Sequence, residues 1–199
     1  MKYLFVDLDG VITKPKLNNT FDFVFCFYKV YSCRNRLKKL IIKVLTFIGI
    51  LPFIRQKIRK VQILTLFRGL DSQELGQFAR RYWIRYVQDN LNKEIVDLIE
   101  HYKKGYKLVL LTACTEFPAK ALGEYLRFHD VISTTFIIEN DKIIGIKEDV
   151  FGSLKVKAVF KRYPLEVIRD SCYITDTPRL ESNLFKVFKS VYVVKNRKK

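Results

Sequence analysis

The sequence predicts an α/β fold: a Rossmann-like core with a parallel sheet, and a helical cap inserted after the first strand. Three observations lead to this prediction. Short apolar runs recur along the chain, stretches with helical periodicity separate them, and a basic segment interrupts the alternation after the first run. Strands that alternate with helices indicate a parallel, doubly wound sheet. With 199 residues, the chain is long enough for one well-buried domain and a modest insertion.

Four short apolar runs are expected to form the parallel strands. The first covers residues 3–6 and stops abruptly at Asp7. Its uninterrupted apolar character is typical of a strand that is buried on both faces of a sheet. The other three runs cover residues 107–111, 171–175 and 190–194.

A helix and a hairpin are expected between these strands. Apolar residues at helical spacing predict a helix before the second strand, with Ile95, Leu98, Ile99 and Tyr102 on one face. Segments 131–139 and 142–146 are joined by Asn140 and Asp141, two residue types that suit a tight turn. This pattern predicts a β-hairpin.

Residues 14–86 have a different character and are expected to form the cap, while residues 1–13 and 87–199 form the core. Between Lys14 and Arg85 there are sixteen basic residues and only three acidic ones, so most of the net charge of +17 lies in this segment. The segment has long apolar stretches without the period of two that marks strands, which favours helices. Asp71 or Ser72 is expected to cap a helix that carries Leu75, Phe78, Ala79, Tyr82 and Trp83.

The stretch 40–54 carries a single charge, at Lys43, and has two structural interpretations. It is shorter than the roughly 20 residues that a membrane span needs, and Gly49 and Pro52 would interrupt a helix. It therefore forms either a core helix or an interfacial helix on an anionic membrane surface. The second interpretation rests on the basic residues on both sides, which are Arg34, Arg36, Lys38, Lys39, Arg55, Lys57, Arg59 and Lys60.

The cysteines favour a reducing compartment. No C-x-x-C pair occurs among the four cysteines, Cys26, Cys33, Cys114 and Cys172, and the chain has only two histidines that could serve as further ligands. This pattern argues against a zinc site. The chain reads directly into a strand without a secretory signal, so we expect a cytoplasmic protein with reduced thiols. The basic segment adds the alternative of a peripheral position on the inner face of the membrane.

Two carboxylates follow the first strand, in the sequence Asp7-Leu8-Asp9-Gly10. Carboxylates two residues apart at a strand end can point to the same side, and Gly10 lets the backbone turn closely around an anion. A carboxylate in this position can attack phosphorus and so divide one difficult hydrolysis into two easier steps.

Three later segments supply complementary groups. The hydroxyl of Thr112 and the amide of Ala113 follow the second strand and could hold phosphoryl oxygens. Lys155, three residues after Gly152, could neutralise both a phosphoryl group and a carboxylate, with Lys157 as a rival. Asp176 and Glu181 follow the third parallel strand and would complete an oxygen-only site for Mg²⁺. In a parallel sheet all four strand ends open on the same edge.

This order of acid pair, hydroxyl, lysine and acid resembles the haloacid dehalogenase superfamily and covers nearly the whole chain. The insertion between the first two motifs resembles the phosphoserine-phosphatase-like branch, which has a helical cap there. The resemblance implies that Asp7 is the nucleophile and that Asp9 protonates the leaving oxygen and then activates water. It further implies roles for two sets of residues. The phosphoryl group would be bound by Leu8, Gly10, Thr112, Ala113 and Lys155, and Mg²⁺ by Asp7, the Asp9 carbonyl and Asp176.

The sequence departs from the family pattern at the last motif. Thr175 stands where a glycine is usual, and the second acid, Glu181, follows five residues after Asp176. Glu181 would therefore either bind the metal or order its waters. Asp9 favours phosphate-ester hydrolysis, because relatives that transport ions or cleave carbon–halogen bonds lack an acid at that position.

The cap is expected to select a phosphorylated small molecule or a lipid-linked phosphate. Its apolar and basic composition resembles that of C-type phosphatidylglycerophosphatases. Arg68 is a candidate for binding an anionic substrate, with a solvated surface arginine as the alternative. No nucleic-acid-binding motif is present, which ranks nucleic acid below lipid as a partner. Two other functions remain open: a phosphotransferase, and a membrane-surface binding module with little turnover. The sequence predicts no oligomeric state.

Overall fold

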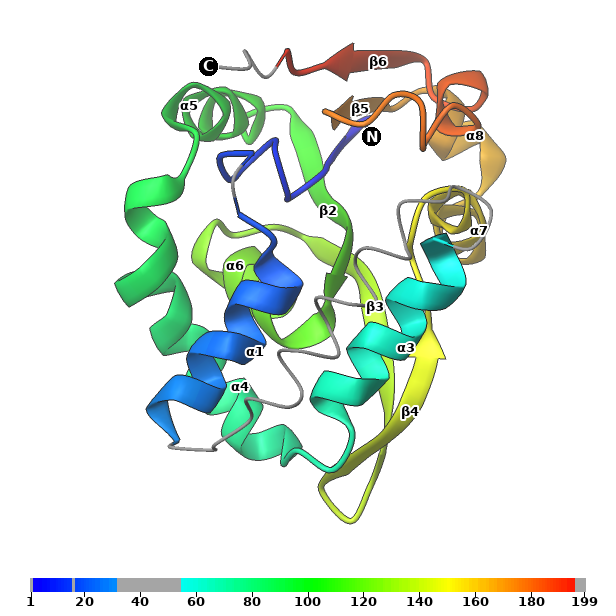
Figure 1. Ribbon diagram of the computed structural model, residues 1–199. Coiled ribbons are helices and arrows are strands. Elements are labelled where there is room, and N and C mark those ends of the chain that lie inside the picture. Colours follow the sequence, from blue (N-terminus) through cyan, green and yellow to red (C-terminus); the bar gives the residue numbers. More distant parts are fainter. Residues whose placement is uncertain (1, 16, 32–54, 196–199) are drawn as a thin grey trace.

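The computed structural model describes residues 2–15, 17–31 and 55–195, and its centre is a six-stranded sheet with the strand order β4-β3-β2-β1-β5-β6 (Figure 1). The strands are β1 (Lys2–Val6), β2 (Tyr106–Thr115), β3 (Asp130–Glu139), β4 (Lys142–Glu148), β5 (Cys172–Thr175) and β6 (Ser190–Val193). Neighbouring strands are parallel except for β4, which runs antiparallel to β3 at the edge. The predicted α/β fold with a parallel sheet is confirmed.

The order of the strands reverses at β1, which lies between β2 and β5. Val6, the last residue of β1, pairs with Leu110 on one side and with Ile174 on the other. The residues just beyond these pairs therefore meet at one edge of the sheet, and they carry the predicted acid pair, hydroxyl and last acid, whereas the lysine motif follows β4. In open α/β sheets, ligands bind at such a reversal, outside the carboxyl ends of the strands.

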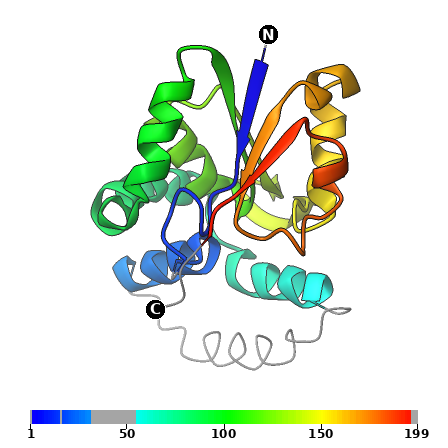
Figure 2. The same ribbon diagram turned by 90° about the horizontal axis from the view of Figure 1, so that it is seen from above.

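Helices cover both faces of the sheet. Helices α5 (Lys93–Tyr102) and α6 (Glu116–Tyr125) lie on one face, and α7 (Leu154–Arg162) and α8 (Leu165–Arg169) on the other (Figure 2). Alternate residues of β1 belong to different hydrophobic clusters, with Leu4 and Val6 in one and Phe5 in the other. This alternation follows from the period of two in a strand, and it explains why the run is apolar throughout.

Three helices form the described part of segment 14–86. These are α1 (Asn19–Val30), α3 (Arg55–Phe67) and α4 (Ser72–Tyr82), and α4 continues into a π-helical turn (Trp83–Val87) and a 3₁₀ turn (Gln88–Asn90). Figure 2 shows α1 and α3 beyond the end of the sheet toward which β1 runs. The Asp71 carboxylate caps α4, as predicted, by accepting hydrogen bonds from the backbone N–H groups of Gln73 and Glu74 at 2.9 and 3.0 Å.

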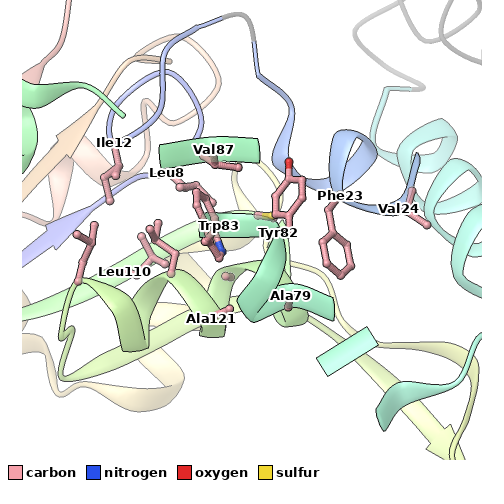
Figure 3. Packing of buried hydrophobic residues seen from close by; sticks show 14 of the residues in the cluster. Leu8, Ile12, Phe23, Val24, Ala79, Tyr82, Trp83, Val87, Leu110 and Ala121 are labelled. Atoms are coloured by element: carbon pink, nitrogen blue, oxygen red, sulfur yellow. The ribbon is translucent and has the colours of Figure 1, made fainter. Parts of the chain in front are cut away.

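Aromatic side chains join these helices to the rest of the core. Phe23 of α1 contacts Tyr82 edge-to-face, with 5.3 Å between the ring centroids, and both lie in the cluster that also holds Leu110 (Figure 3). The indole N–H of Trp83 donates to the Pro118 carbonyl at 2.6 Å. Burial of a large apolar side chain contributes about 1.5–3 kcal/mol, so these contacts hold the helices firmly on the sheet.

The predicted hairpin is also present, as β3 and β4. Asn140 and Asp141 both have positive φ, 48° and 61°, as a type I′ turn requires. On its outer edge β4 pairs with the loop before α4: the Gly69 N–H donates to the Ile143 carbonyl at 2.8 Å, and the Ile143 N–H to the Leu70 carbonyl at 3.0 Å. The loop thus covers the edge strand and ties the inserted helices to the hairpin.

Residues 40–54, for which we expected a core or an interfacial helix, lie outside the described residues. Among the helices that the structure does describe, none has the length and apolar character needed to cross a membrane.

Candidate active site

Asp7 and Asp9 lie on the turn that follows β1. The Asp7 N–H continues the sheet by donating to the Ile174 carbonyl at 2.9 Å, and the Asp7 Oδ1 accepts from the Leu8 N–H at 2.8 Å. The Leu8 side chain between the two acids is fully buried in the hydrophobic cluster. Gly10 has a φ of 76°, a conformation that glycine adopts without strain, and so allows the chain to turn at this point.

Helix α1 holds the Asp9 carboxylate. Asp9 Oδ1 accepts two hydrogen bonds from Asn19, one from its backbone N–H at 3.0 Å and one from its side-chain amide at 2.5 Å. The same amide lies 3.0 Å from the Thr13 hydroxyl. Asn19 is the first residue of α1, so the start of this helix fixes the second carboxylate of the motif.

Lys155 is buried beside Asp7. Its ammonium Nζ lies 2.7 Å from Asp7 Oδ2 and 2.6 Å from Glu181 Oε1, and its side chain is only 1% exposed. The lysine belongs to the first turn of α7, just after Gly152, whose φ is 56°. Its rival Lys157 lies on the exposed side of the same helix. The structure therefore brings the lysine of the G-x-x-K pattern to the acid pair.

The Glu181 carboxylate has three partners within the cluster. Besides Lys155, it accepts hydrogen bonds from the Tyr173 hydroxyl at 2.7 Å and from the Thr175 hydroxyl at 2.6 Å, both on its Oε2. The Tyr173 hydroxyl is also 3.0 Å from the lysine Nζ. Thr175, which replaces the usual glycine, thus holds Glu181, and Glu181 holds the lysine.

Burial dominates the electrostatics of these acids. It raises the pKa of Asp7 to about 7, although Lys155 pulls it down, and Glu181 raises it further. Burial also raises the pKa of Asp9, against the hydrogen bonds from Asn19, and that of Asp176. For Lys155, burial acts to lower the pKa, but the two neighbouring carboxylates outweigh it and the pKa is raised. The carboxylates thus lie in a low-dielectric site where additional positive charge would stabilise their ionised forms.

The available donors fit a hard divalent cation. Within the described ranges, no three acid, histidine or cysteine side chains converge tightly enough to form a metal cluster by themselves. Mg²⁺ does not need such a cluster, because it is usually held by one or two carboxylates, waters and substrate oxygens. Asp7 and Asp176 follow two neighbouring strands, β1 and β5, and the backbone carbonyl of Asp9 lies on the same turn as Asp7.

Thr112 lies beyond the end of β1 on the neighbouring strand. The sequence predicted that this strand would end at Leu111, but β2 continues to Thr115, with an irregularity in its pairing with β3 between Leu111 and Thr115. Within this irregular stretch, the Thr112 hydroxyl accepts from the Cys114 N–H at 3.0 Å. The Ala113 carbonyl accepts from the Thr134 hydroxyl at 3.0 Å.

Arg59 of α3 is a part of the site that the sequence analysis missed. Its guanidinium pairs with the buried Asp149 carboxylate at 2.9 Å, donates to the Ala113 carbonyl and lies 5.0 Å from the centre of the Phe151 ring. The sequence places Arg59 among the basic residues that flank the possible interfacial helix. It is instead buried. Its spacing in the sequence could have indicated this burial. Arg59 precedes Gln62, Ile63 and Leu66 by three, four and seven residues, and these residues form the buried face of α3.

Arg68, the predicted substrate-binding residue, is not brought to this cluster. It is exposed just after the other end of α3, next to the loop that pairs with β4. Nine residues of a helix correspond to about 13 Å, so Arg68, just after α3, lies well away from Arg59 in its second turn.

Comparison with known proteins identifies the family. The profile described as haloacid dehalogenase-like hydrolase matches residues 4–179. The chain belongs to this family, as the order of its motifs predicted. No curated protein matches the chain by sequence.

Solved structures show the same fold at low sequence identity. A protein of unknown function from Bordetella pertussis Tohama I has a TM-score of 0.69 and 17% identity, over 88% of this chain and 82% of that one. A phosphoserine phosphohydrolase-like protein from Francisella tularensis subsp. tularensis SCHU S4 has a TM-score of 0.62 and 16% identity, over 94% and 82%. A phospho-aspartyl intermediate analogue of phosphoserine phosphatase has a TM-score of 0.60 and 14% identity, over 98% and 94%. The predicted phosphoserine-phosphatase-like fold is confirmed.

Proposed function

We propose that the protein is a Mg²⁺-dependent phosphatase that hydrolyses a phosphomonoester through a phosphoryl group carried by Asp7. The observation that carries this proposal is the buried pair of Asp7 and Lys155, 2.7 Å apart, at the point where the strand order reverses. A buried ammonium that contacts a nucleophilic carboxylate can also neutralise the oxygens of a phosphoryl group bound between them.

Asp7 and Asp9 divide the chemistry in this proposal. A carboxylate oxygen of Asp7 attacks phosphorus and forms an acyl phosphate, while the bond from phosphorus to the ester oxygen breaks. Asp9 gives its proton to that leaving oxygen. It then takes a proton from water, which attacks phosphorus, releases inorganic phosphate and restores the Asp7 carboxylate. The raised pKa of Asp9 suits a group that must both donate and accept a proton.

The surrounding residues hold the phosphoryl group. The Thr112 hydroxyl, Lys155 and backbone amides at Leu8, Gly10 and Ala113 are proposed to bind its oxygens. Mg²⁺ would be held by Asp7, the Asp9 carbonyl and Asp176, and when bound it neutralises the charge of the phosphoryl oxygens. We assign Glu181 to the positioning of Lys155, since both of its carboxylate oxygens have partners within the protein.

Residues 14–86 are proposed to act as a cap that covers the carboxyl ends of the strands and selects the substrate. The start of α1 contacts Asp9, and α3 supplies Arg59 beside the phosphoryl site. This arrangement suits a small metabolite or a lipid-linked phosphomonoester. In the proposal Arg59, rather than Arg68, is the cation that the described part of the cap places beside the reaction.

The test is release of phosphate from p-nitrophenyl phosphate in the presence of Mg²⁺. We expect turnover by the unmodified protein and none by Asp7→Asn, after deamidation back to aspartate has been excluded by mass spectrometry. Asp97→Asn is the matched control, because it makes the same change at an exposed aspartate of α5. Full turnover by Asp7→Asn would overturn the mechanism.

Two alternatives, a phosphotransferase activity and binding to a membrane surface, are tested separately. Transfer of the phosphoryl group to an added alcohol, faster than to water, would make the protein a phosphotransferase. Peripheral binding to an anionic membrane would appear as co-sedimentation with liposomes that contain anionic lipid, and it should weaken as salt is added. Equal sedimentation with neutral and anionic liposomes would remove the membrane surface as a partner.

A further inference from the structure

An open pocket of about 730 Å³ adjoins the catalytic cluster at Asp176. It lies between the first turn of α3, the loop before α7 and the loop after β5. Its lining residues come both from α3, in the proposed cap, and from the core, and Figure 1 shows the first turn of α3 beside α7. Asp176 lines the pocket and is also a proposed ligand of Mg²⁺. A substrate with its phosphoryl group at Asp7 therefore has room for its leaving group here.

Two arginines give the pocket an excess of positive charge. Arg55 comes from the cap and Arg179 from the loop after β5, and Asp176 is the only acid among the described residues that line the pocket. Neither arginine forms an ion pair with any residue in the described part of the chain. Both are exposed to solvent.

Arg59 differs from these two arginines because its guanidinium already forms an ion pair within the protein. It pairs with Asp149 at 2.9 Å and donates to the Ala113 carbonyl. Its guanidinium lies on the Phe151 ring, which Arg55 also approaches, with 5.8 Å between the guanidinium carbon and the ring centre. Among the described residues that line the pocket, the cations available for a ligand are thus Arg55 from α3 and Arg179 from the loop after β5.

The rest of the wall combines polar side chains, from Gln56, Ser153 and Thr177, with apolar ones. Phe151, Pro178 and Leu180 line the pocket, and Leu180 is 37% exposed. These side chains suit a short carbon skeleton, while an arginine guanidinium binds a carboxylate or a phosphate through two parallel N–H groups.

We propose that this pocket selects phosphomonoesters whose leaving group carries a second anionic group, bound between Arg55 and Arg179. This inference rests on the proposed phosphatase function and names the substrate class of that same site. The second anion is a carboxylate or a phosphate, either on a free metabolite or on a lipid head group.

The test compares phosphomonoesters that carry a second anion on the leaving group with phosphomonoesters that do not. 3-Phosphoglycerate and glycerol 3-phosphate share their carbon skeleton and differ by a carboxylate in place of a hydroxymethyl group. We expect kcat/KM for the first to exceed that for the second by about tenfold or more, and Arg55→Gln or Arg179→Gln to lower this ratio about tenfold, which is the lower end for a charged hydrogen bond. Phosphatidylglycerophosphate and phosphatidic acid in mixed micelles form the corresponding lipid pair. A preference confined to one pair identifies the source of the anion.

Lys57→Gln is the matched control. Lys57 is exposed on the same helix as Arg55 but does not line the pocket, so its loss removes the same charge and should leave both ratios unchanged. Equal turnover of both members of both pairs would overturn the inference, as would ratios that neither arginine variant changes. Failure to hydrolyse any of these esters, p-nitrophenyl phosphate included, would instead overturn the proposed function and this inference with it.

Discussion

Replacement of Lys155 by methionine should separate the structural role of this lysine from its catalytic role. The ammonium has two carboxylate partners, at 2.7 Å in Asp7 and 2.6 Å in Glu181, and all three side chains are buried. Methionine has a similar length but no charge, so Lys155→Met leaves two buried carboxylates without their shared cation. Removal of one partner from a buried ion pair costs about 3–5 kcal/mol, and we expect a loss of that size in the free energy of unfolding.

A second substitution should return much of this stability without activity. In Lys155→Met/Glu181→Gln the uncompensated charge of Glu181 is removed as well, and we expect roughly half of the lost stability to return. Both variants should remain inactive, because the cation that contacts the phosphoryl group is absent. The single variant should also recover stability as the pH falls, since protonation of the two carboxylates removes their unpaired charge.

Urea denaturation in the presence of EDTA, followed by circular dichroism, measures these differences without compensation by a bound metal. Lys157→Met is the control, and an exposed substitution of this kind should change stability by no more than about 0.5 kcal/mol. The reasoning would be refuted by a Lys155→Met protein as stable as the unmodified one. It would also be refuted if the double variant were no more stable than the single one.

Three further predictions concern the metal, the second acid and the cap. Because the pKa of Asp7 is raised to about 7, the folded metal-free protein holds more protons than the unfolded chain between about pH 4 and 7, so its stability falls as pH rises through that window. Mg²⁺ should therefore raise the melting temperature more at about pH 8 than at about pH 5. Equal increases in melting temperature at the two pH values would contradict the assignment of Asp7 as a ligand of Mg²⁺. Asp9→Asn should lower kcat for p-nitrophenyl phosphate by about a hundredfold or more, and a normal kcat would exclude Asp9 as acid and base. Arg59→Gln leaves the buried Asp149 carboxylate with the more distant Lys60, 3.8 Å away, as its ion-pair partner among the described residues. We expect this variant to lose about 3 kcal/mol in the free energy of unfolding, measured by urea denaturation. A loss as small as that of Lys57→Gln would show that the ion pair of Arg59 and Asp149 contributes little.

Local chemistry explains why much of the fold was predictable. The apolar run of β1 indicates that this strand is buried on both faces, and the end of the run at Asp7 indicates where the strand leaves the sheet. Asn140 and Asp141 tolerate the positive φ that the turn between β3 and β4 requires. In the same way, the Asp71 carboxylate can accept from the first N–H groups of α4. Each of these features depends on neighbours in the sequence.

Contacts between distant segments were not predictable in the same way. The sequence pattern of α3 shows that Arg59 shares a face with apolar residues. It does not show that Arg59 pairs with Asp149, 90 residues further along the chain. The role of Glu181 stayed open for a similar reason, because its partners Lys155, Tyr173 and Thr175 come together only in the folded sheet. The end of β2 was misplaced because irregular pairing with β3 carries the strand on to Thr115.

The most direct test of the mechanism is to trap the phosphorylated enzyme. The protein is mixed with Mg²⁺ and a substrate that it hydrolyses, quenched in acid, digested and analysed by mass spectrometry. We expect a single phosphoryl group on the peptide that contains Asp7, and its loss on treatment with hydroxylamine, which cleaves acyl phosphates. Turnover of the substrate without any phosphorylated peptide, or with the phosphoryl group on another residue, would contradict the central claim that Asp7 is the nucleophile.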